Sequence, residues 1–245
     1  DEGDDVAFDG SASTDPDSDS LTYEWDFEFN GVDFDVDATG AMVTHAFADE
    51  YSGLVGLRVS DGVDSDVATH TIEVSNVDPT GSITGVNTRD EGELLSLEGN
   101  ATDPGTADVL TYEWDYDYQV GAFVVEDSGQ TVTHTYADDS DCTGGVCTVA
   151  LRVSDGDGGE HISTLAVTVS NVPPVVEAGE NKNPVEGATV TFNGNATDVG
   201  ADTLTYLWDL DGDGQFDDGT GEEVTFVYTD DADITAALRV TDGDG

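Results

Sequence analysis

The segment DLDGDGQFDD, residues 209–218, places aspartates at alternate positions with glycines between and after them. This is the one-three-five order of oxygen ligands in calcium-binding loops, where a glycine then allows a sharp bend. The candidate ligands are Asp209, Asp211, Asp213, Gln215, Asp217 and Asp218. The same spacing is also ordinary turn chemistry, because Asp accepts hydrogen bonds from its own backbone and Gly adopts positive φ.

The net charge limits the classes of partner. The chain has 245 residues and a formal charge of -50, with 55 acidic side chains against five Lys and Arg. Phosphate binding needs clustered Lys and Arg, so this balance excludes nucleic acid and disfavours anionic membranes. With no long apolar run, we expect no membrane-spanning segment. Self-repulsion of this size destabilises a compact state unless cations reduce it, which leaves calcium binding and high-salt adaptation as alternatives.

Internal repetition organises the chain. LTYEWD around Trp25 returns around Trp114, and as LTYLWD around Trp208, followed each time by an LRV[ST]DG segment. Three copies of a unit of about 90 residues result. We predict domains at residues 1–78 (copy 1), 79–172 (copy 2) and 173–245 (copy 3), joined by short Pro-containing linkers into a rod of beads.

Within each copy, apolar and polar residues alternate with the period of a β-strand. In copy 2 the expected strands lie near 81–87, 94–99, 109–117, 122–125, 129–136, 147–154 and 161–171. Seven short strands separated by turns predict an all-β fold, an antiparallel two-sheet sandwich of immunoglobulin-like type. Aligned with copy 2, copy 1 lacks the first strand and copy 3 lacks the last. We therefore expect the polypeptide to continue, or neighbouring subunits to donate strands.

The residues STDPDSDSLTYEWDFE, the THAF and THTY segments and LRVSDG resemble the polycystic-kidney-disease (PKD) repeat family over essentially the whole chain. The resemblance implies extracellular immunoglobulin-like sandwiches without a catalytic centre. Such domains occur in surface-layer, adhesive and filament proteins and as spacers in secreted hydrolases. The chain departs from the family's WDFGDG after each Trp, which leaves the geometry of that loop open.

The resemblance also implies metal ligands. Some family members bind calcium where an interdomain linker meets an Asp-x-Asp loop and the Asp after the LxV strand. Carried to this chain, the positions are Asp15, Asp17 and Asp61 in copy 1, Asn76, Asp103 and Asp155 in copy 2, and Asn171, Asp198 and Asp242 in copy 3. Asp108 and Asp202 are candidates to complete the sites of copies 2 and 3. The competing interpretation is that these residues only form turns.

The loop of the opening segment recurs in graded form after each Trp. Copy 1 retains Asp26, Glu28 and Asn30 before a glycine, whereas copy 2 retains two aspartates and has Gln119 in the third place. Repetition of the oxygen series therefore favours calcium in copy 3 first, then in copy 1.

Other residues have structural interpretations. His45 and His134 align with Phe226, so we predict packing positions rather than metal ligands. Equivalent arginines on the LRV strands should lie across from glutamates of the YEWD strands, and the expected pairs are Arg58 with Glu24 and Arg152 with Glu113. Leu207 replaces the glutamate in copy 3, so Arg239 needs another partner.

Cys142 and Cys147 bracket a short loop, and in a chain of extracellular style we predict a disulfide that closes a hairpin. The NAT triplets at Asn100 and Asn195 are candidate N-glycosylation acceptors.

Together these features predict a non-enzymatic, calcium-stabilised, extracellular array in a surface filament, layer or giant adhesin, with neighbouring repeats or subunits as partners. The alternative is a spacer or polymer-binding region of a secreted hydrolase, with Tyr116, Tyr118 and Phe123 as exposed contacts.

Overall fold

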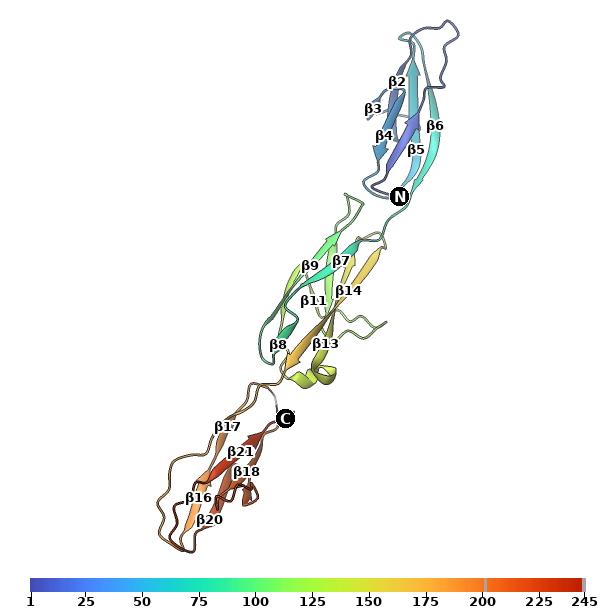
Figure 1. The fold of residues 1–245 in the computed structure, drawn as a ribbon. Coiled ribbons are helices and arrows are strands. Elements are labelled where there is room, and N and C mark those ends of the chain that lie inside the picture. Colours follow the sequence, from blue (N-terminus) through green and yellow to red (C-terminus); the bar gives the residue numbers. More distant parts are fainter. Residues whose placement is uncertain (201, 244–245) are drawn as a thin grey trace.

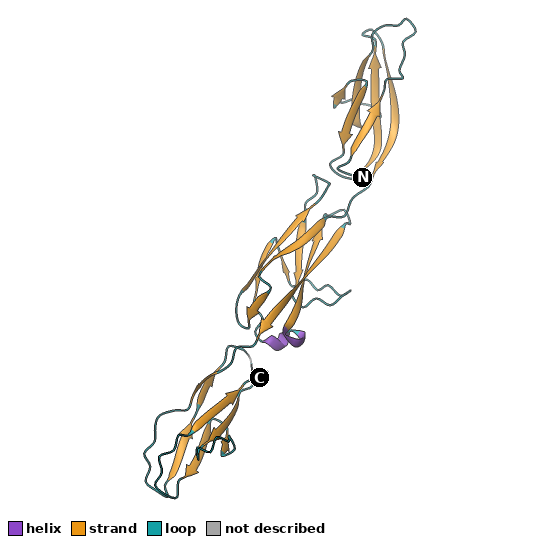
Figure 2. Cartoon of the chain, viewed as in Figure 1, coloured by secondary structure: helices purple, strands orange, loops and turns teal. Residues whose placement is uncertain are grey.

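The computed structural model describes residues 1–200 and 202–243. Three β-sandwiches follow one another as an elongated rod, and a short linker joins each sandwich to the next (Figure 1). Strands dominate all three, and the helical turns lie at the lower end of copy 2 (Figure 2). The predicted all-β, immunoglobulin-like architecture is confirmed. Among the described residues, no helix is long and apolar enough to cross a membrane.

Copy 1 packs a two-stranded sheet against a four-stranded one. The small sheet pairs β1 (Asp5–Asp9) with β4 (Met42–Ala46). The larger sheet has the order β3-β2-β5-β6, formed by β3 (Ala38–Thr39), β2 (Thr22–Phe29), β5 (Tyr51–Ser60) and β6 (Ser65–Val74).

Copy 2 has one more strand on each sheet. The three-stranded sheet has the order β12-β9-β7, formed by β12 (Thr131–His134), β9 (Leu95–Thr102) and β7 (Thr80–Gly85). The five-stranded sheet has the order β11-β10-β13-β14-β8, formed by β11 (Asp127–Ser128), β10 (Thr111–Asp115), β13 (Val146–Ser154), β14 (Glu160–Ser170) and β8 (Thr88–Asp90). All pairings are antiparallel except β14 with β8.

Copy 3 repeats the plan with shorter strands. Its first sheet consists of two pairs: β15 (Val175–Glu177) with β17 (Asn195–Thr197), and β16 (Thr189–Asn193) with β20 (Glu223–Val227). Its second sheet has the order β19-β18-β21, formed by β19 (Gly219–Thr220), β18 (Thr205–Asp209) and β21 (Ala237–Thr241).

A buried tryptophan organises each core because its strand is central and its indole spans the gap between sheets. Trp25, Trp114 and Trp208 belong to three separate apolar clusters, one in each copy. Each indole N–H donates to a glycine carbonyl across the sandwich at 2.8–2.9 Å, as expected for a buried indole. In copy 2, Gly99 lies against the ring of Trp114, and a Cβ on Gly99 would approach Leu151 Cδ2 to 2.8 Å.

One strand prediction for copy 2 was wrong. Residues 122–125 form a loop with an isolated bridge between Gln119 and Ala122, and the short strand follows at β11. The apolar side chain of Phe123 is used for local packing, because it lies 6.0 Å from the ring of Tyr118 and 4.7 Å from the guanidinium carbon of Arg152.

The predicted packing of the two histidines and the predicted ion pairs of Arg58 and Arg152 are confirmed. His134 stacks on Tyr116 with ring centroids 3.9 Å apart, and burial lowers the pKa of its imidazole. Arg152 pairs with Glu113 at 2.5 Å, and Arg58 pairs with its glutamate at 2.7 Å. Arg239 lies opposite a leucine but keeps the contact with a phenylalanine ring, at 4.6 Å, that Arg58 and Arg152 also make.

Cys142 and Cys147 form the predicted disulfide. The segment it closes is not a β-hairpin. It contains the second of two short 3₁₀ helices, η1 (Asp139–Asp141) and η2 (Thr143–Gly145), and leads directly into β13. The bridge therefore fixes a compact turn at the end of copy 2 that faces copy 3.

Candidate metal centres at the junctions between copies

The junction of copies 1 and 2 gathers acidic and amide side chains from both domains and from the linker. Glu2, at the lower end of copy 1, is 1% exposed. Its Oε1 accepts a hydrogen bond from the backbone N–H of Val77 in the linker at 2.8 Å. The neighbouring Asn76 donates from Nδ2 to Oδ2 of Asp155, which follows β13 of copy 2, at 3.0 Å. One carboxylate from each copy is thus tied to the same linker.

Several oxygens at this junction are buried without a hydrogen-bond partner. They are Glu2 Oε2, Asn76 Oδ1, Asp103 Oδ2 and both carboxylate oxygens of Asp108. Oxygens of Glu2, Asp49 and Asp108 lie within 4.8 Å of one another. Buried carboxylates without donors are costly unless a cation compensates them, since desolvation and mutual repulsion act in the same direction.

The surroundings of this cluster shift the pKa values of two of its aspartates. Burial and the charges of Glu2 and Asp103 raise the pKa of Asp108 to about 6. Burial alone would also raise the pKa of Asp155, but donors from Asn76 and from three backbone N–H groups lower it below its ordinary value. Asp155 is therefore held as an anion beside the group of unpartnered oxygens.

The junction of copies 2 and 3 repeats the arrangement. Glu91, also 1% exposed, accepts from Val172 N–H of the linker at 2.8 Å. Asn171 donates to Asp242 at 3.2 Å, while its Oδ1 is buried without a partner, as is Oδ2 of Asp198. Oxygens of Glu91, Asp198 and Asp202 lie within 4.8 Å of one another, and a second group joins Glu91 with Asp138 and Asp139.

Glycines bring the copies close enough for these groups to meet. Gly3 and Gly92, directly after the two buried glutamates, both have φ of +73°, which L side chains rarely adopt. A Cβ on Gly3 would lie 2.6 Å from the carbonyl oxygen of Pro104, and one on Gly92 would collide with Cγ1 of Val199. Each glycine contacts the next copy, so glutamate and glycine together form one side of the junction.

The structure brings together the linker and loop residues predicted for copies 2 and 3. In copy 2, Asn76 is hydrogen-bonded to Asp155, and the charge of Asp103 raises the pKa of Asp108. In copy 3, Asn171 is hydrogen-bonded to Asp242, and Asp198 lies beside Asp202. Whether these residues hold calcium stays a prediction. The sequence analysis missed the acids that the preceding copy contributes. They are Glu2, Asp49 and Glu50 at the first junction, and Glu91, Asp138 and Asp139 at the second. The available signal was the repeated DEG at residues 1–3 and 90–92.

In copy 1 the corresponding predicted residues are not covered by another domain among the described residues. Asp15 accepts from the backbone N–H groups of Asp17 and Asp19 at 2.7 and 3.1 Å. Asp61 accepts from Val63 and Asp64 N–H, both at 2.7 Å, and these bonds lower its pKa. Here the acids form turns, as the competing interpretation expects.

The loop at 209–218 is cross-linked by its own carboxylates. Both oxygens of Asp209, which is 4% exposed, accept backbone N–H groups, from Gly212 at 2.7 Å and Gly214 at 2.9 Å. Asp218 accepts from the N–H groups of residues 210 and 211. Asp213 accepts from both nitrogens of Gln215. These bonds account for the alternating acids without an ion, and calcium binding by this loop stays a prediction.

The equivalent loop of copy 1 uses the same device. Asp26 accepts from the N–H groups of Glu28 at 3.2 Å and Asp35 at 2.9 Å. Asn30 caps the bend by accepting from residues 32 and 33. The glycosylation candidates Asn100 and Asn195 are exposed on β9 and β17, where their modification is untested.

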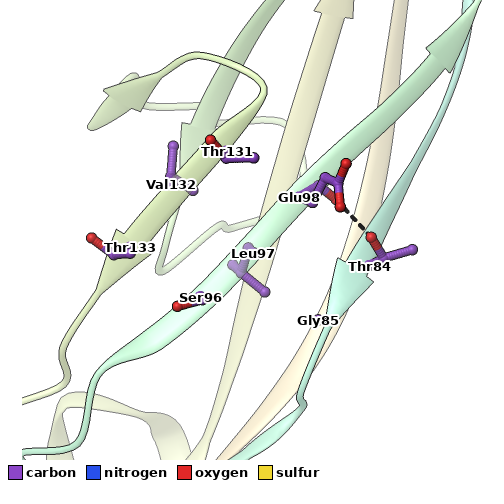
Figure 3. A pocket seen from close by; sticks show the side chains of 8 residues that line it. All are labelled: Thr84, Gly85, Ser96, Leu97, Glu98, Thr131, Val132 and Thr133. Atoms are coloured by element: carbon purple, nitrogen blue, oxygen red, sulfur yellow. Dashed lines mark hydrogen bonds between the residues drawn. The ribbon is translucent and has the colours of Figure 1, made fainter.

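A hollow of about 550 Å³ lies over β7, β9 and β12 of copy 2 (Figure 3). Its polar lining consists mainly of hydroxyl groups, and Thr84 donates to the backbone oxygen of Glu98 at 3.3 Å. Among the lining residues that the structure describes, Glu98 is the one with a carboxylate.

The family model described as "PKD domain" matches residues 1–75, 76–169 and 171–245. The chain belongs to the PKD domain family. Tandem PKD repeats are generally extracellular or surface domains, and they are typically non-catalytic.

Similar solved structures are arrays of immunoglobulin-like domains. Three N-terminal domains of the outer capsid protein Hoc of bacteriophage RB49 are 16% identical over 98% of this chain and 90% of theirs, with a TM-score of 0.35. Eight N-terminal domains of Down Syndrome Cell Adhesion Molecule are 14% identical over 86% of this chain and 30% of theirs, with a TM-score of 0.39. An ICAM-5 D1–D4 fragment is 14% identical over 99% of this chain and 71% of its own, with a TM-score of 0.37.

Proposed function

We propose that this array of PKD domains is an extracellular structural element, a strut of a surface filament, layer or giant adhesin, whose joints are stiffened by calcium. The observation that carries the proposal is the set of buried, unpartnered oxygens where copy 1 meets copy 2, among them Glu2 Oε2 and Asp103 Oδ2. The chemistry of this set is that of a hard-cation site, because carboxylate and amide oxygens are the ligands Ca²⁺ prefers.

The arrangement explains why such an ion would stiffen the rod. Glu2 comes from copy 1, Asn76 from the linker, and Asp103 and Asp108 from copy 2. An ion held by all three segments fixes the angle between the domains. The backbone already contributes one contact there, because Ala107 N–H donates to a carbonyl of copy 1 at 3.0 Å.

The second junction supports the same role by repetition. Glu91 occupies the place of Glu2 and bonds to the linker with the same geometry, 2.8 Å from the donor nitrogen. Two equivalent sites in a chain of charge -50 suit a protein of calcium-rich surroundings. Without an ion, acids of neighbouring domains repel one another and the joint loosens.

Calorimetric calcium titration of the 245-residue chain at constant ionic strength tests the proposal. We expect two junction sites, of which Glu2→Gln removes the first and Glu91→Gln removes the second. Glu186→Gln is the matched control, since Glu186 holds the equivalent position of copy 3, directly before Gly187, and is exposed. Small-angle scattering should show a shorter, more bent ensemble after chelation and in the two Gln variants.

Absence of binding heat together with an unchanged melting temperature in calcium would refute the calcium proposal, because a ligand of the folded state must stabilise it. An equal loss of binding in Glu186→Gln would instead refute the assignment to the junctions. Sodium chloride at matched ionic strength separates specific binding from screening.

The hydrolase-accessory alternative receives no support from its predicted aromatic contacts. Tyr116 is buried, 5% exposed, with its hydroxyl against Asp127 at 3.1 Å. Tyr118 and Phe123 are half-buried and pack near each other. These rings stabilise the loop and do not form a binding platform.

A further inference from the structure

An asparagine directly before a glycine occurs at two places in the chain, Asn30–Gly31 in copy 1 and Asn193–Gly194 in copy 3. Asparagine is one of the thermally labile side chains of proteins. When glycine follows it, no Cβ shields the next backbone nitrogen, so that nitrogen can reach the side-chain carbon Cγ. The two pairs have the same local chemistry, and the fold therefore decides which of them can react.

The pair in copy 1 lies in the exposed loop that follows β2. Gly31 has φ of +85°, and a Cβ there would meet no atom of the described residues within 4 Å. Among the described residues, none accepts a hydrogen bond from the Gly31 N–H. The backbone nitrogen next to Asn30 is therefore both exposed and free of protein partners.

The side-chain amide of Asn30 is held by the same loop. Its Oδ1 accepts hydrogen bonds from the backbone N–H groups of Val32 at 2.8 Å and Asp33 at 2.9 Å. Donors on this oxygen stabilise the negative charge that develops there when a nucleophile adds to Cγ, as the donors of an oxyanion hole do. The loop therefore activates the amide carbon beside an unhindered nitrogen.

The pair in copy 3 is protected by the sheet. Gly194 lies between β16 and β17, and its N–H donates to the carbonyl of Glu222 at 2.7 Å. This hydrogen bond must break before the nitrogen can attack Cγ of Asn193.

The loop of copy 3 that corresponds to the Asn30 loop also binds the nitrogen of its glycine. Gly214 aligns with Gly31, and its N–H donates to Oδ2 of Asp209 at 2.9 Å. In copy 1 the equivalent carboxylate, that of Asp26, accepts from the N–H groups of residues 28 and 35 instead. Gly31 is therefore left without the partner that its counterpart has.

We propose that Asn30 of the folded chain is a site of spontaneous modification, which converts it to aspartate and isoaspartate through a succinimide with water as the co-reactant. The Gly31 nitrogen bonds to Cγ of Asn30 and the Cγ–Nδ2 bond breaks. Nδ2 leaves as ammonia and carries away the proton of the Gly31 amide. Water then adds to either carbonyl of the succinimide and opens the ring. The net change is uptake of water and loss of ammonia, without oxidation or reduction.

The aspartate product fits the loop, as copy 3 shows. Asp213 aligns with Asn30 and accepts from the backbone N–H two residues further on at 2.7 Å, as Asn30 does at 2.8 Å. Isoaspartate instead adds a methylene to the main chain and shortens the side chain, so it should lose the hydrogen bonds to residues 32 and 33. The reaction therefore adds a negative charge to copy 1 and divides the chains into those with an intact turn and those with a broken one.

Mass spectrometry of tryptic fragments tests the proposal on the 245-residue chain, incubated folded in warm neutral buffer. Cleavage after Arg58, Lys182 and Arg239 separates the two pairs into fragments 1–58 and 183–239. Asn30 is the only Asn or Gln of fragment 1–58, so exchange of NH₂ for OH in its mass reports this residue alone. A sample taken at zero time corrects for conversion during digestion.

The two fragments should convert at different rates only while the chain is folded. We expect Asn193 to convert at least ~10-fold more slowly than Asn30, because the hydrogen bond of Gly194 must open first. In urea, which removes that bond, the two rates should become similar. Fragmentation of 1–58 should show both aspartate and isoaspartate at residue 30.

Two variants locate the reacting nitrogen. Gly31→Ala places a Cβ beside it, so fragment 1–58 should stay unconverted over the time in which half of the parent chain converts. Val32→Ala changes the next, exposed residue and should keep the parent rate. Amide hydrogen exchange at residues 32 and 33 establishes that both variants keep the turn. Equal rates for Asn30 and Asn193 in the folded chain would overturn the proposal, and so would conversion of Asn30 in urea alone or a parent rate in Gly31→Ala.

Discussion

Substitution of Gly92 by alanine separates the role of the junction from the stability of its domains. Gly92 has φ of +73°, and a Cβ there would collide with Cγ1 of Val199 in copy 3. Valine is short and β-branched, so its methyl group has little freedom to move aside. We expect the clash to be relieved by a shift of Val199 and of the copy 3 loop that carries it, which also carries Asp198.

Two free-energy costs are expected. A non-glycine residue with left-handed φ costs about 1–2 kcal/mol, which lowers the stability of copy 2 itself. The second cost acts on the joint. Calcium ligands must stand 2.3–2.6 Å from the ion, so a displacement of a few tenths of an ångström at Asp198 should weaken calcium binding by roughly 10-fold or more.

Gly187→Ala provides the matched control. Gly187 has the same φ of +73°, occupies the same position of its repeat and donates to an equivalent carbonyl. A Cβ there meets no atom of the described residues within 4 Å. Both variants should lose similar domain stability in thermal unfolding. Only Gly92→Ala should lose calcium affinity at the second junction by calorimetry and show a bent rod by small-angle scattering. Equal calcium affinities for Gly92→Ala, Gly187→Ala and the parent chain would refute the reasoning.

Three further outcomes follow from the contacts of the domains. In denaturant titrations, Arg152→Met should lower the unfolding free energy of copy 2 by about 1–2 kcal/mol, because an ion pair and a cation–π contact are lost. The loss should be smaller in concentrated salt, which screens the ion pair. Arg239→Met should show little salt dependence in the same titrations. Replacement of Cys142 and Cys147 by serine should cost about 2 kcal/mol in denaturant unfolding, because the closed loop is short. Chelation should lower the melting temperature at 0.15 M sodium chloride, and concentrated sodium chloride should restore it only in part.

The repeat pattern was sufficient to predict contacts within a copy. Because Arg152 and Glu113 occupy equivalent positions in neighbouring strands, alignment and strand period predict their pairing, and the structure confirms it. The stacking of Arg239 on Phe216 was not predicted, although a phenylalanine follows each core Trp by eight or nine residues and the equivalent arginines lie over Phe34 and Phe123. The strand predicted at 122–125 failed because Phe123 packs locally, near Tyr118 and Arg152.

Contacts between copies needed the structure. Asn76 and Asp103 were accessible to the sequence analysis through the family resemblance, which places ligands in the linker and in the Asp-containing loop. Glu2 lies about 100 residues from Asp103, and only the way one domain sits on the next brings the two together. The repeated DEG motif marks this glutamate in the sequence, but only the structure shows that its carboxylate reaches the next copy.

The burial of these acids supports the calcium proposal over high-salt adaptation as the explanation of the net charge. Exposed carboxylates, such as those of Asp17 and Asp217, are screened by any salt and are consistent with high-salt surroundings. Bulk sodium screens buried groups far less, and Glu2 and Glu91 are each 1% exposed. Adaptation to salt gives no reason to place a carboxylate in the seam between two domains and to repeat it at the next seam. A discrete divalent ion would give that reason, since it is coordinated by oxygens from both domains, compensates their burial and fixes the joint.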